Sequence, residues 1–170
     1  MRATCTQGVS SPVKVKLLSP SQWSASKEKI TRFLYRYGDK RITTAALAAL
    51  QGLAPARLAA SRAASSGGSG GGEAGAEAAI AIAVISGKLA AVAFAEDGGE
   101  SACFVVVSPE FRGQGAGSAL LAALHRRLGR LTCAVAADNP SSMNMCFRAG
   151  MKAVSLHIGP TGKPTLRFES

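Results

Sequence analysis

The stretch from Val105 to Ser118 constrains this chain more than any other, because it carries a strand, a turn, a glycine-rich loop and the start of a helix. Three consecutive valines suit a buried, pleated strand. Pro109 cannot donate to a β-ladder, so we expect the strand to end at or just before it. Beyond the loop, leucines recur at helical spacing, and Gly129 is placed to end the helix.

Three glycines, Gly113, Gly115 and Gly117, lie where that helix begins. Glycine has no Cβ, so a bulky anion can approach the backbone at these positions. The first turn of a helix also offers unpaired N–H groups and the positive end of the helix dipole. The sequence therefore predicts a diphosphate-binding loop. A turn without a ligand explains three glycines poorly, since each costs about 1 kcal/mol of ordering.

The spacing of these glycines separates three kinds of glycine loop. A Walker A loop ends in Gly-Lys and then Ser or Thr, whereas Gly117 is followed directly by Ser118. A dinucleotide fingerprint needs a third glycine where this chain has Ser118, although Asp138 lies roughly where a ribose-binding acid is found. The remaining pattern, Arg112-x-x-Gly115-x-Gly117, closely resembles the pyrophosphate-binding signature of the GNAT superfamily of acyl-CoA-dependent N-acetyltransferases.

Length and composition favour one domain. The 170 residues are enough for a single sizeable core. We expect one GNAT-like acetyltransferase domain over residues 1–170, with a loose tail at 1–11 and a flexible Gly/Ser loop at 64–76. The small residues of 54–77 are interpreted as a loop between a helix and the sheet. No metal is predicted, because the cysteines lack C-x-x-C spacing and neither histidine has a partner at metal-ligand spacing.

No membrane association or secretion is expected. The N-terminal residues lack the apolar core of a signal peptide. The apolar run from Ala78 to Ala95 contains Lys88, and a lysine at mid-bilayer costs about 2.5–3.5 kcal/mol. Two β-rich segments around a Ser-Gly-Lys turn explain this run as a hairpin. We therefore expect a soluble cytoplasmic protein, whose oligomeric state the sequence leaves open.

The net charge of +10 is concentrated in the N-terminal part. Residues 1–62 carry eleven Lys and Arg against two acids, and residues 63–170 carry nine against eight. A solvated helix face, an acidic acceptor substrate, the phosphates of a cofactor and nonspecific nucleic-acid contact all explain this balance. Nucleic acid is not expected as a partner, because no basic motif interleaved with aromatic residues or helix-turn-helix pattern occurs.

Residue patterns predict the element order β-α-α-β-β-β-α-β-α-β-β, which is also the GNAT order. The expected strands are 13–18, 80–85, 89–95, 102–107, 131–137, 151–158 and 165–168. A helical crossover places the strand at 131–137 parallel to the one that ends at Val107. The fold class implied is α/β (α+β), a three-layer α/β/α arrangement with a central mixed, mostly antiparallel sheet splayed at the cofactor site.

The resemblance implies acetyl-CoA as acyl-donor co-substrate and assigns the residues that hold it. Backbone groups of Val105 and Val107 pair with the pantetheine amides, and the N–H of Val106 or Val107 faces the thioester carbonyl. The resemblance implies that the pyrophosphate binds the backbone N–H groups of Arg112, Gly113, Gln114, Gly115, Ala116, Gly117 and Ser118. Asn139, before the next helix, is implied to bind the pantetheine arm, with helix capping as the alternative.

The resemblance also implies a catalytic acid and a base. The family usually places tyrosine, which protonates the leaving thiolate, at the position of Cys146. A thiol with a pKa near 8.5 can still donate, but Cys146 can equally serve only in packing. Glu100 is the nearest match to the family's base, with a solvated turn acid as the alternative.

The function expected from these residues is transfer of an acetyl group from acetyl-CoA to a primary amine by direct attack. The acceptor is a small-molecule amine or a protein amine, which the sequence does not name. The alternative is a catalytically weak sensor or assembly module of the same fold that binds acyl-CoA. The missing tyrosine and the uncertain base keep this alternative open.

Overall fold

The structure of the chain is a computed structural model that describes residues 12–38, 41–59 and 77–170. The tail expected at 1–11 and the loop expected at 64–76 lie outside the described residues. The elements are β1 (Lys14–Leu17), α1 (Pro20–Tyr37), α2 (Thr44–Gly52), α3 (Ala56–Ala59), β2 (Ala78–Ile85), β3 (Lys88–Glu96), η1 (Asp97–Gly99), β4 (Ala102–Val107), η2 (Pro109–Phe111), α4 (Ala116–Leu128), β5 (Thr132–Ala136), α5 (Pro140–Arg148), β6 (Lys152–Ile158) and β7 (Pro164–Glu169).

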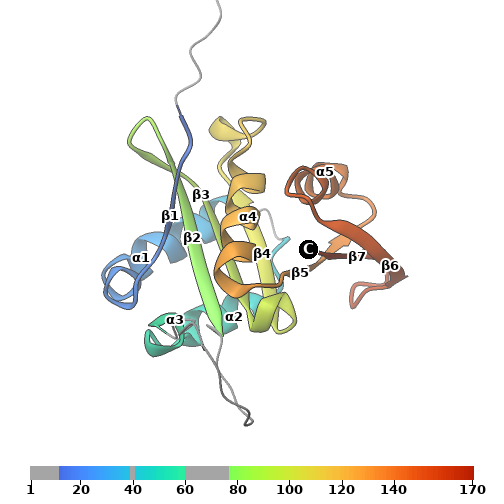
Figure 1. Cartoon of the computed structure of the whole chain (residues 1–170), viewed down its shortest axis with the longest axis horizontal. Helices are drawn as coiled ribbons and strands as arrows, with labels where there is room; N and C mark the ends of the chain where they lie inside the picture. Colours follow the sequence, from blue (N-terminus) through green and yellow to red (C-terminus); the bar gives the residue numbers. More distant parts are fainter. Residues whose placement is uncertain (1–11, 39–40, 60–76) are drawn as a thin grey trace, which may run out of the picture.

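The described strands form two sheets, a four-stranded sheet in the order β1-β2-β3-β4 and a three-stranded sheet in the order β5-β7-β6 (Figure 1). All their pairings are antiparallel. The α+β class with a splayed sheet is confirmed, but the single mixed sheet is replaced by two antiparallel sheets. The reason is that β5 bonds to β7 and not to β4, so the two strands share no ladder and belong to separate sheets.

Helices cover both faces of the four-stranded sheet, α4 on one and α1 with α2 on the other (Figure 1). Side chains alternate along β2 and β3, as the period of a strand requires. The face toward α4 is lined by alanines, and the face toward α1 and α2 is lined by larger residues such as Ile80, Val92 and Phe94. The small alanine side chains let the buried leucines of α4 pack close to the sheet.

The ends of the helices follow local chemistry that the sequence predicts. Ser19 and Gln22 form a capping box at the start of α1. Gly129 ends α4 in the left-handed conformation. Gly38 also ends α1, but in the right-handed conformation, and a Cβ there would lie 2.6 Å from the Leu34 carbonyl oxygen. Gly38 is therefore required by close contact and not by a positive φ.

The interpretation of 54–77 as a loop throughout is wrong for its first part, where α3 forms. Leu58 is 3% exposed and anchors this short helix in the core beside α1 and α2. Arg57 reaches the carboxylates of Glu77, Glu96 and Asp97. Both interactions depend on residues distant in sequence, so the alanine-rich composition of this segment gives no sign of them.

Candidate active site

Among the strands that the structure describes, none pairs with the outer edge of β4, which faces a gap between the two sheets. The backbone N–H of Ser108 donates to the Ala90 carbonyl at 2.9 Å, which fixes the phase of the ladder between β4 and β3. Residues of an antiparallel strand alternate between bonding to the partner and facing away from it. Val106 therefore bonds to β3, whereas the N–H and C=O groups of Val105 and Val107 face the gap. Of the two donors that the sequence offers for the thioester carbonyl, only Val107 points outward.

The edge of β5 forms the second wall of the gap. The N–H of Ala137 donates to the Pro164 carbonyl at 2.8 Å, so by the same alternation the backbone of Ala134 and Ala136 faces away from β7. The strands come together at their beginnings, because a Cβ on Gly99 would overlap the Thr132 carbonyl oxygen. From there β5 leads away from β4 (Figure 1). The gap thus opens toward the glycine-rich loop.

The three glycines of this loop have two different structural roles. Gly113 and Gly115 adopt positive φ angles of 79° and 82°, and a Cβ on either would meet no atom within 4 Å. Their backbone conformation is what requires glycine. Gly117 is helical, and a Cβ there would lie 2.3 Å from the Met145 Sδ. Close packing of α4 against α5 therefore requires Gly117.

The start of α4 offers the N–H groups predicted to hold a pyrophosphate. Gly115 is the N-cap and supplies no side chain to cap the helix, so the first-turn N–H groups, including those of Ala116 and Gly117, have no intrahelical partner. The Ser118 hydroxyl donates to the Met145 carbonyl at 3.1 Å, and this hydrogen bond joins α4 to α5. The first turn of α4 thus presents backbone donors beside the end of β4.

Arg112 and Gln114 are exposed in the loop. The Arg112 Nε donates to the Val107 carbonyl at 3.3 Å and so links the loop to the end of β4. This carbonyl is one of the groups assigned to pantetheine, and here it accepts from a protein side chain. Binding of pantetheine at this carbonyl therefore involves Arg112 as well as β4.

Asn139 is the N-cap of α5, as its capping interpretation predicts. Its Oδ1 accepts from the Ser142 backbone N–H at 3.3 Å, and its Nδ2 donates to the Ser142 hydroxyl at 2.8 Å. Both polar atoms of the Asn139 amide are thus engaged within the first turn of α5. If the Asn139 amide contacts a pantetheine arm, it must share or replace its two hydrogen bonds with Ser142.

Cys146 lies in a buried cluster of sulfur atoms beneath α5. Its side chain is 1% exposed, and its Sγ lies 3.4 Å from the Cys133 Sγ. Hydrogen bonding to Cys133 and burial raise the pKa of the Cys146 thiol. The pKa of Cys133 is raised to about 12, chiefly by hydrogen bonding to Cys103. A buried thiol with a raised pKa is a weak acid, so these surroundings favour a packing role for Cys146.

Glu100 lies just before β4 and links this strand to β5 and β7 of the other sheet. Its carboxylate accepts from the Arg167 guanidinium at 2.6 and 3.2 Å and from the Thr132 hydroxyl at 3.4 Å. The hydrogen bond with Arg167 lowers the pKa of Glu100. A carboxylate with a lowered pKa is a weaker proton acceptor. The geometry therefore favours Glu100 as a tie between β4, β5 and β7.

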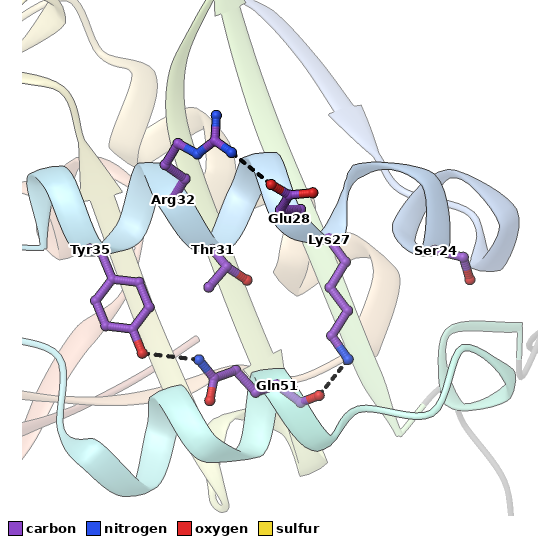
Figure 2. Close-up of a pocket in the computed structure, with 7 residues that line it drawn as sticks. All are labelled: Ser24, Lys27, Glu28, Thr31, Arg32, Tyr35 and Gln51. Carbon is purple, nitrogen blue, oxygen red and sulfur yellow. Dashed lines mark hydrogen bonds and ion pairs between the residues drawn. The ribbon is translucent and has the colours of Figure 1, made fainter.

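A groove of about 700 Å³ lies between α1 and α2, apart from the gap (Figure 2). It is lined by Ser24, Lys27, Glu28, Thr31, Arg32, Tyr35 and Gln51. The Lys27 Nζ donates to the Gln51 carbonyl at 2.6 Å, and the Gln51 side chain donates to the Tyr35 hydroxyl at 3.2 Å. None of the site residues predicted from the sequence lines this groove, and no motif in the sequence points to it.

Neither a membrane-spanning helix nor a metal site is found where the structure describes the chain. Over residues 12–38, 41–59 and 77–170, no helix combines the length and apolar character needed to cross a bilayer. In the same ranges, no three His, Cys, Asp or Glu side chains are grouped so as to hold a metal ion.

Comparison with known proteins supports the family resemblance. A family model described as an acetyltransferase (GNAT) domain matches residues 76–147, which include β2 to β5 and most of α5. A search among curated proteins finds no significant sequence match. The resemblance seen in the glycine-rich loop is confirmed by this match, which includes the loop but covers less than half of the chain.

Solved structures agree on the fold over nearly the whole chain. The aminoglycoside acetyltransferase AAC(6')-Ib, solved with paromomycin and acetyl-CoA, is 15% identical with a TM-score of 0.59 and covers 93% of this chain and 92% of its own. The same enzyme solved with coenzyme A is 16% identical, with a TM-score of 0.55 and 94% of each chain covered. A protein from Desulfovibrio desulfuricans assigned to the GNAT family is 13% identical with a TM-score of 0.58, covering 94% of this chain and 98% of its own. At these identities the likeness concerns the fold.

Proposed function

We propose that this protein transfers the acetyl group of acetyl-CoA to a primary amine by direct attack on the thioester. The observation that carries the proposal is the gap between β4 and β5, where the N–H and C=O groups of Val105 and Val107 face away from β3 along one wall. The glycine-rich loop and the first turn of α4 lie at its open end. The match of residues 76–147 to the GNAT acetyltransferase family model supports acetyl-CoA as the co-substrate. We further propose that residues 1–170 form a single domain.

Two parts of the chain are proposed to hold acetyl-CoA. The pantetheine amides bind the outward N–H and C=O groups of Val105 and Val107, as an added strand does at a sheet edge. The pyrophosphate binds the N–H groups of residues 112–118, where the glycines leave the backbone accessible. Asn139 and Arg112 then contact the pantetheine after exchanging the hydrogen bonds they make in this structure.

The chemistry requires a neutral amine near the thioester carbonyl. The amine nitrogen bonds to the carbonyl carbon, and the outward N–H of Val107 stabilises the oxyanion, a contribution typically worth about 3–4 kcal/mol. The carbon–sulfur bond then breaks, CoA leaves as a thiolate, and the ammonium proton passes to solvent. We propose that Glu100 and Cys146 support the two sheets and do not transfer protons. An acceptor whose amine has a pKa lower than that of lysine is then favoured, since a lysine amine with a pKa near 10.4 is almost wholly charged at pH 7.

Substitution of the two neighbouring valines tests this proposal. Val107→Pro removes an N–H that faces the gap, so we expect acetyl-CoA affinity to fall at least tenfold with little change in the unfolding temperature. Val106→Pro removes an N–H that bonds to β3, so we expect it to lower the unfolding temperature clearly. The measurements are calorimetric titration with acetyl-CoA and thiol release over a panel of amines.

Two outcomes would count against the proposal. Unchanged acetyl-CoA affinity in a folded Val107→Pro variant would refute the binding mode along β4. Tight acetyl-CoA binding by the wild-type protein without thiol release from any amine would refute the transfer reaction. That second result would favour the alternative function, an acyl-CoA-binding sensor or assembly module.

A further inference from the structure

Strand β6 forms the exposed outer edge of the three-stranded sheet (Figure 1). Every residue of this strand is exposed. On the neighbouring strands, Val135 of β5 and Phe168 of β7 are buried in one core cluster together with Cys146 of α5. Helix α5 therefore covers one face of β5 and β7 and leaves β6 open to solvent.

Large apolar side chains gather at this edge. Leu156 lies opposite Leu166 of β7, and Leu166 shares a face of the sheet with Phe168, whose ring lies 5.1 Å from that of Phe147 on α5. Leu156 and Ile158 are therefore on the same face as Phe147. We call the exposed residues Phe147, Val154, Leu156 and Ile158 the β6 patch; they are 54, 50, 66 and 69% exposed. They are four of the six large apolar side chains exposed in the described part of the chain, and such a concentration marks an interaction surface.

The backbone of β6 is directed outward at the same positions. The N–H of Gly159 donates to the Lys163 carbonyl at 2.8 Å, and His157 lies opposite Thr165. By the alternation of an antiparallel ladder, His157 bonds to β7, whereas the N–H and C=O groups of Leu156 and Ile158 face away from it. A further strand can therefore bind β6 through hydrogen bonds and apolar contacts together.

The other sheet edges among the described strands are protected against such pairing. The edges are β1 and β4 in one sheet and β5 and β6 in the other. β4 and β5 face each other across the gap, and β1 is short and exposes Lys14 and Lys16, which oppose the docking of another strand. Residues 153–158 of β6 include no lysine, arginine, aspartate or glutamate. This edge therefore lacks the charges that keep an exposed strand unpaired.

We propose that β6 pairs antiparallel with β6 of a second copy of this chain, so that the protein is a dimer. A twofold axis relates the two strands, so the pairing is closed and leaves no β6 edge for a further copy. The uncharged span 153–158 meets an identical uncharged span, and no like charges are placed opposite each other within it. Most of the net charge of +10 belongs to residues 1–62, where it opposes association through other surfaces.

The dimer leaves the proposed acetyl-CoA site open. β5, which borders the gap, is separated from β6 by β7. Pairing of the two edges joins the small sheets into one continuous sheet, with the twofold axis perpendicular to it and both copies of α5 on the same face. The two β6 patches then adjoin between these helices, where Leu156 and Ile158 become buried. The inference therefore does not depend on the proposed acetyl transfer.

Sedimentation equilibrium of the full chain tests the proposal. We expect the wild-type protein to sediment with the mass of two chains at micromolar concentrations. Leu156→Glu and Ile158→Glu place a carboxylate in the paired strands, so each is expected to weaken dimerisation at least tenfold. Tyr35→Glu is the matched control, because Tyr35 on α1 is as exposed as Ile158, at 69%, but lies outside the β6 patch. This variant should remain dimeric.

A second pair of variants separates strand pairing from side-chain packing. Leu156→Ala removes the apolar side chain and keeps the outward N–H, whereas Leu156→Pro removes both. We expect Leu156→Pro to weaken dimerisation at least tenfold more than Leu156→Ala, with circular dichroism confirming that both variants are folded. Acetyl-CoA affinity should be the same in Leu156→Glu and the wild type, because β7 and β5 lie between β6 and the gap.

Three results would overturn the inference, and each leaves the acetyl transfer standing. A wild-type protein that sediments as a single chain would exclude the dimer and favour a strand of a different protein as the partner of β6. A dimer that both glutamate variants retain, or that Tyr35→Glu disrupts equally, would place the interface on another surface. Equal dimerisation of Leu156→Pro and Leu156→Ala would show that the copies do not pair through the edge of β6.

Discussion

Substitution of Gly117 by alanine tests whether this glycine is required by packing or by the backbone conformation of the loop. Gly117 is helical, so an alanine there meets no backbone penalty. Its Cβ would instead lie 2.3 Å from the Met145 Sδ and 3.1 Å from the Met145 Cγ. Gly117→Ala therefore acts on the contact between α4 and α5.

The magnitude follows from the displacement of Met145. Its sulfur must move by roughly 1 Å to restore an ordinary contact distance. Overpacking of this kind costs about 1–3 kcal/mol, and a flexible methionine keeps the cost near the lower end. Alanine also has a helix propensity up to about 1 kcal/mol better than glycine. The two effects partly offset each other, so we expect Gly117→Ala to lower the free energy of unfolding by at most about 1 kcal/mol.

A double-mutant cycle measures the coupling directly. Met145→Ala removes the obstructing side chain, so the double variant should be more stable than the sum of the single effects by about 1–2 kcal/mol. Urea denaturation of the four proteins gives the required values. Gly115→Ala is the control, because its cost of about 1–2 kcal/mol comes from a left-handed φ and should not be relieved by Met145→Ala. Additive effects of Gly117→Ala and Met145→Ala would refute the packing explanation.

Three further results are expected. Cys146→Ala should lower the free energy of unfolding by about 1 kcal/mol and leave kcat nearly unchanged in a thiol-release assay, and a tenfold fall in kcat would restore the acid role of Cys146. Because the pKa of Glu100 is lowered in the folded protein, its contribution to stability is present above the unfolded pKa near 4.3 and is lost as the pH falls through the folded pKa. The stability difference between wild type and Glu100→Gln, followed by thermal melts, should thus shrink in acid, and a difference independent of pH would contradict this. Iodoacetamide should label Cys103 before the buried Cys133 and Cys146, as read by peptide mass spectrometry, and equal rates would contradict the burial and raised pKa of the two inner thiols.

The sequence by itself determined the parts of this protein that depend on local chemistry. The strand at Val105 to Val107, the glycine-rich loop before α4 and the cap at Asn139 all depend on residues within a turn of one another. Proline, glycine and capping side chains act over such short spans, so their positions can be interpreted without a structure. The family resemblance depends on the same local unit.

Only the tertiary structure decided the roles that depend on distant partners. Contact with Met145 decides why position 117 requires glycine. The role of Glu100 depends on its ion pair with Arg167, 67 residues away, and the role of Cys146 depends on its contact with Cys133. The separation into two sheets likewise follows from β7 pairing between β5 and β6. These outcomes depend on which side chains meet when helices and strands pack, and a glycine or a glutamate looks the same in the sequence whichever neighbour it acquires.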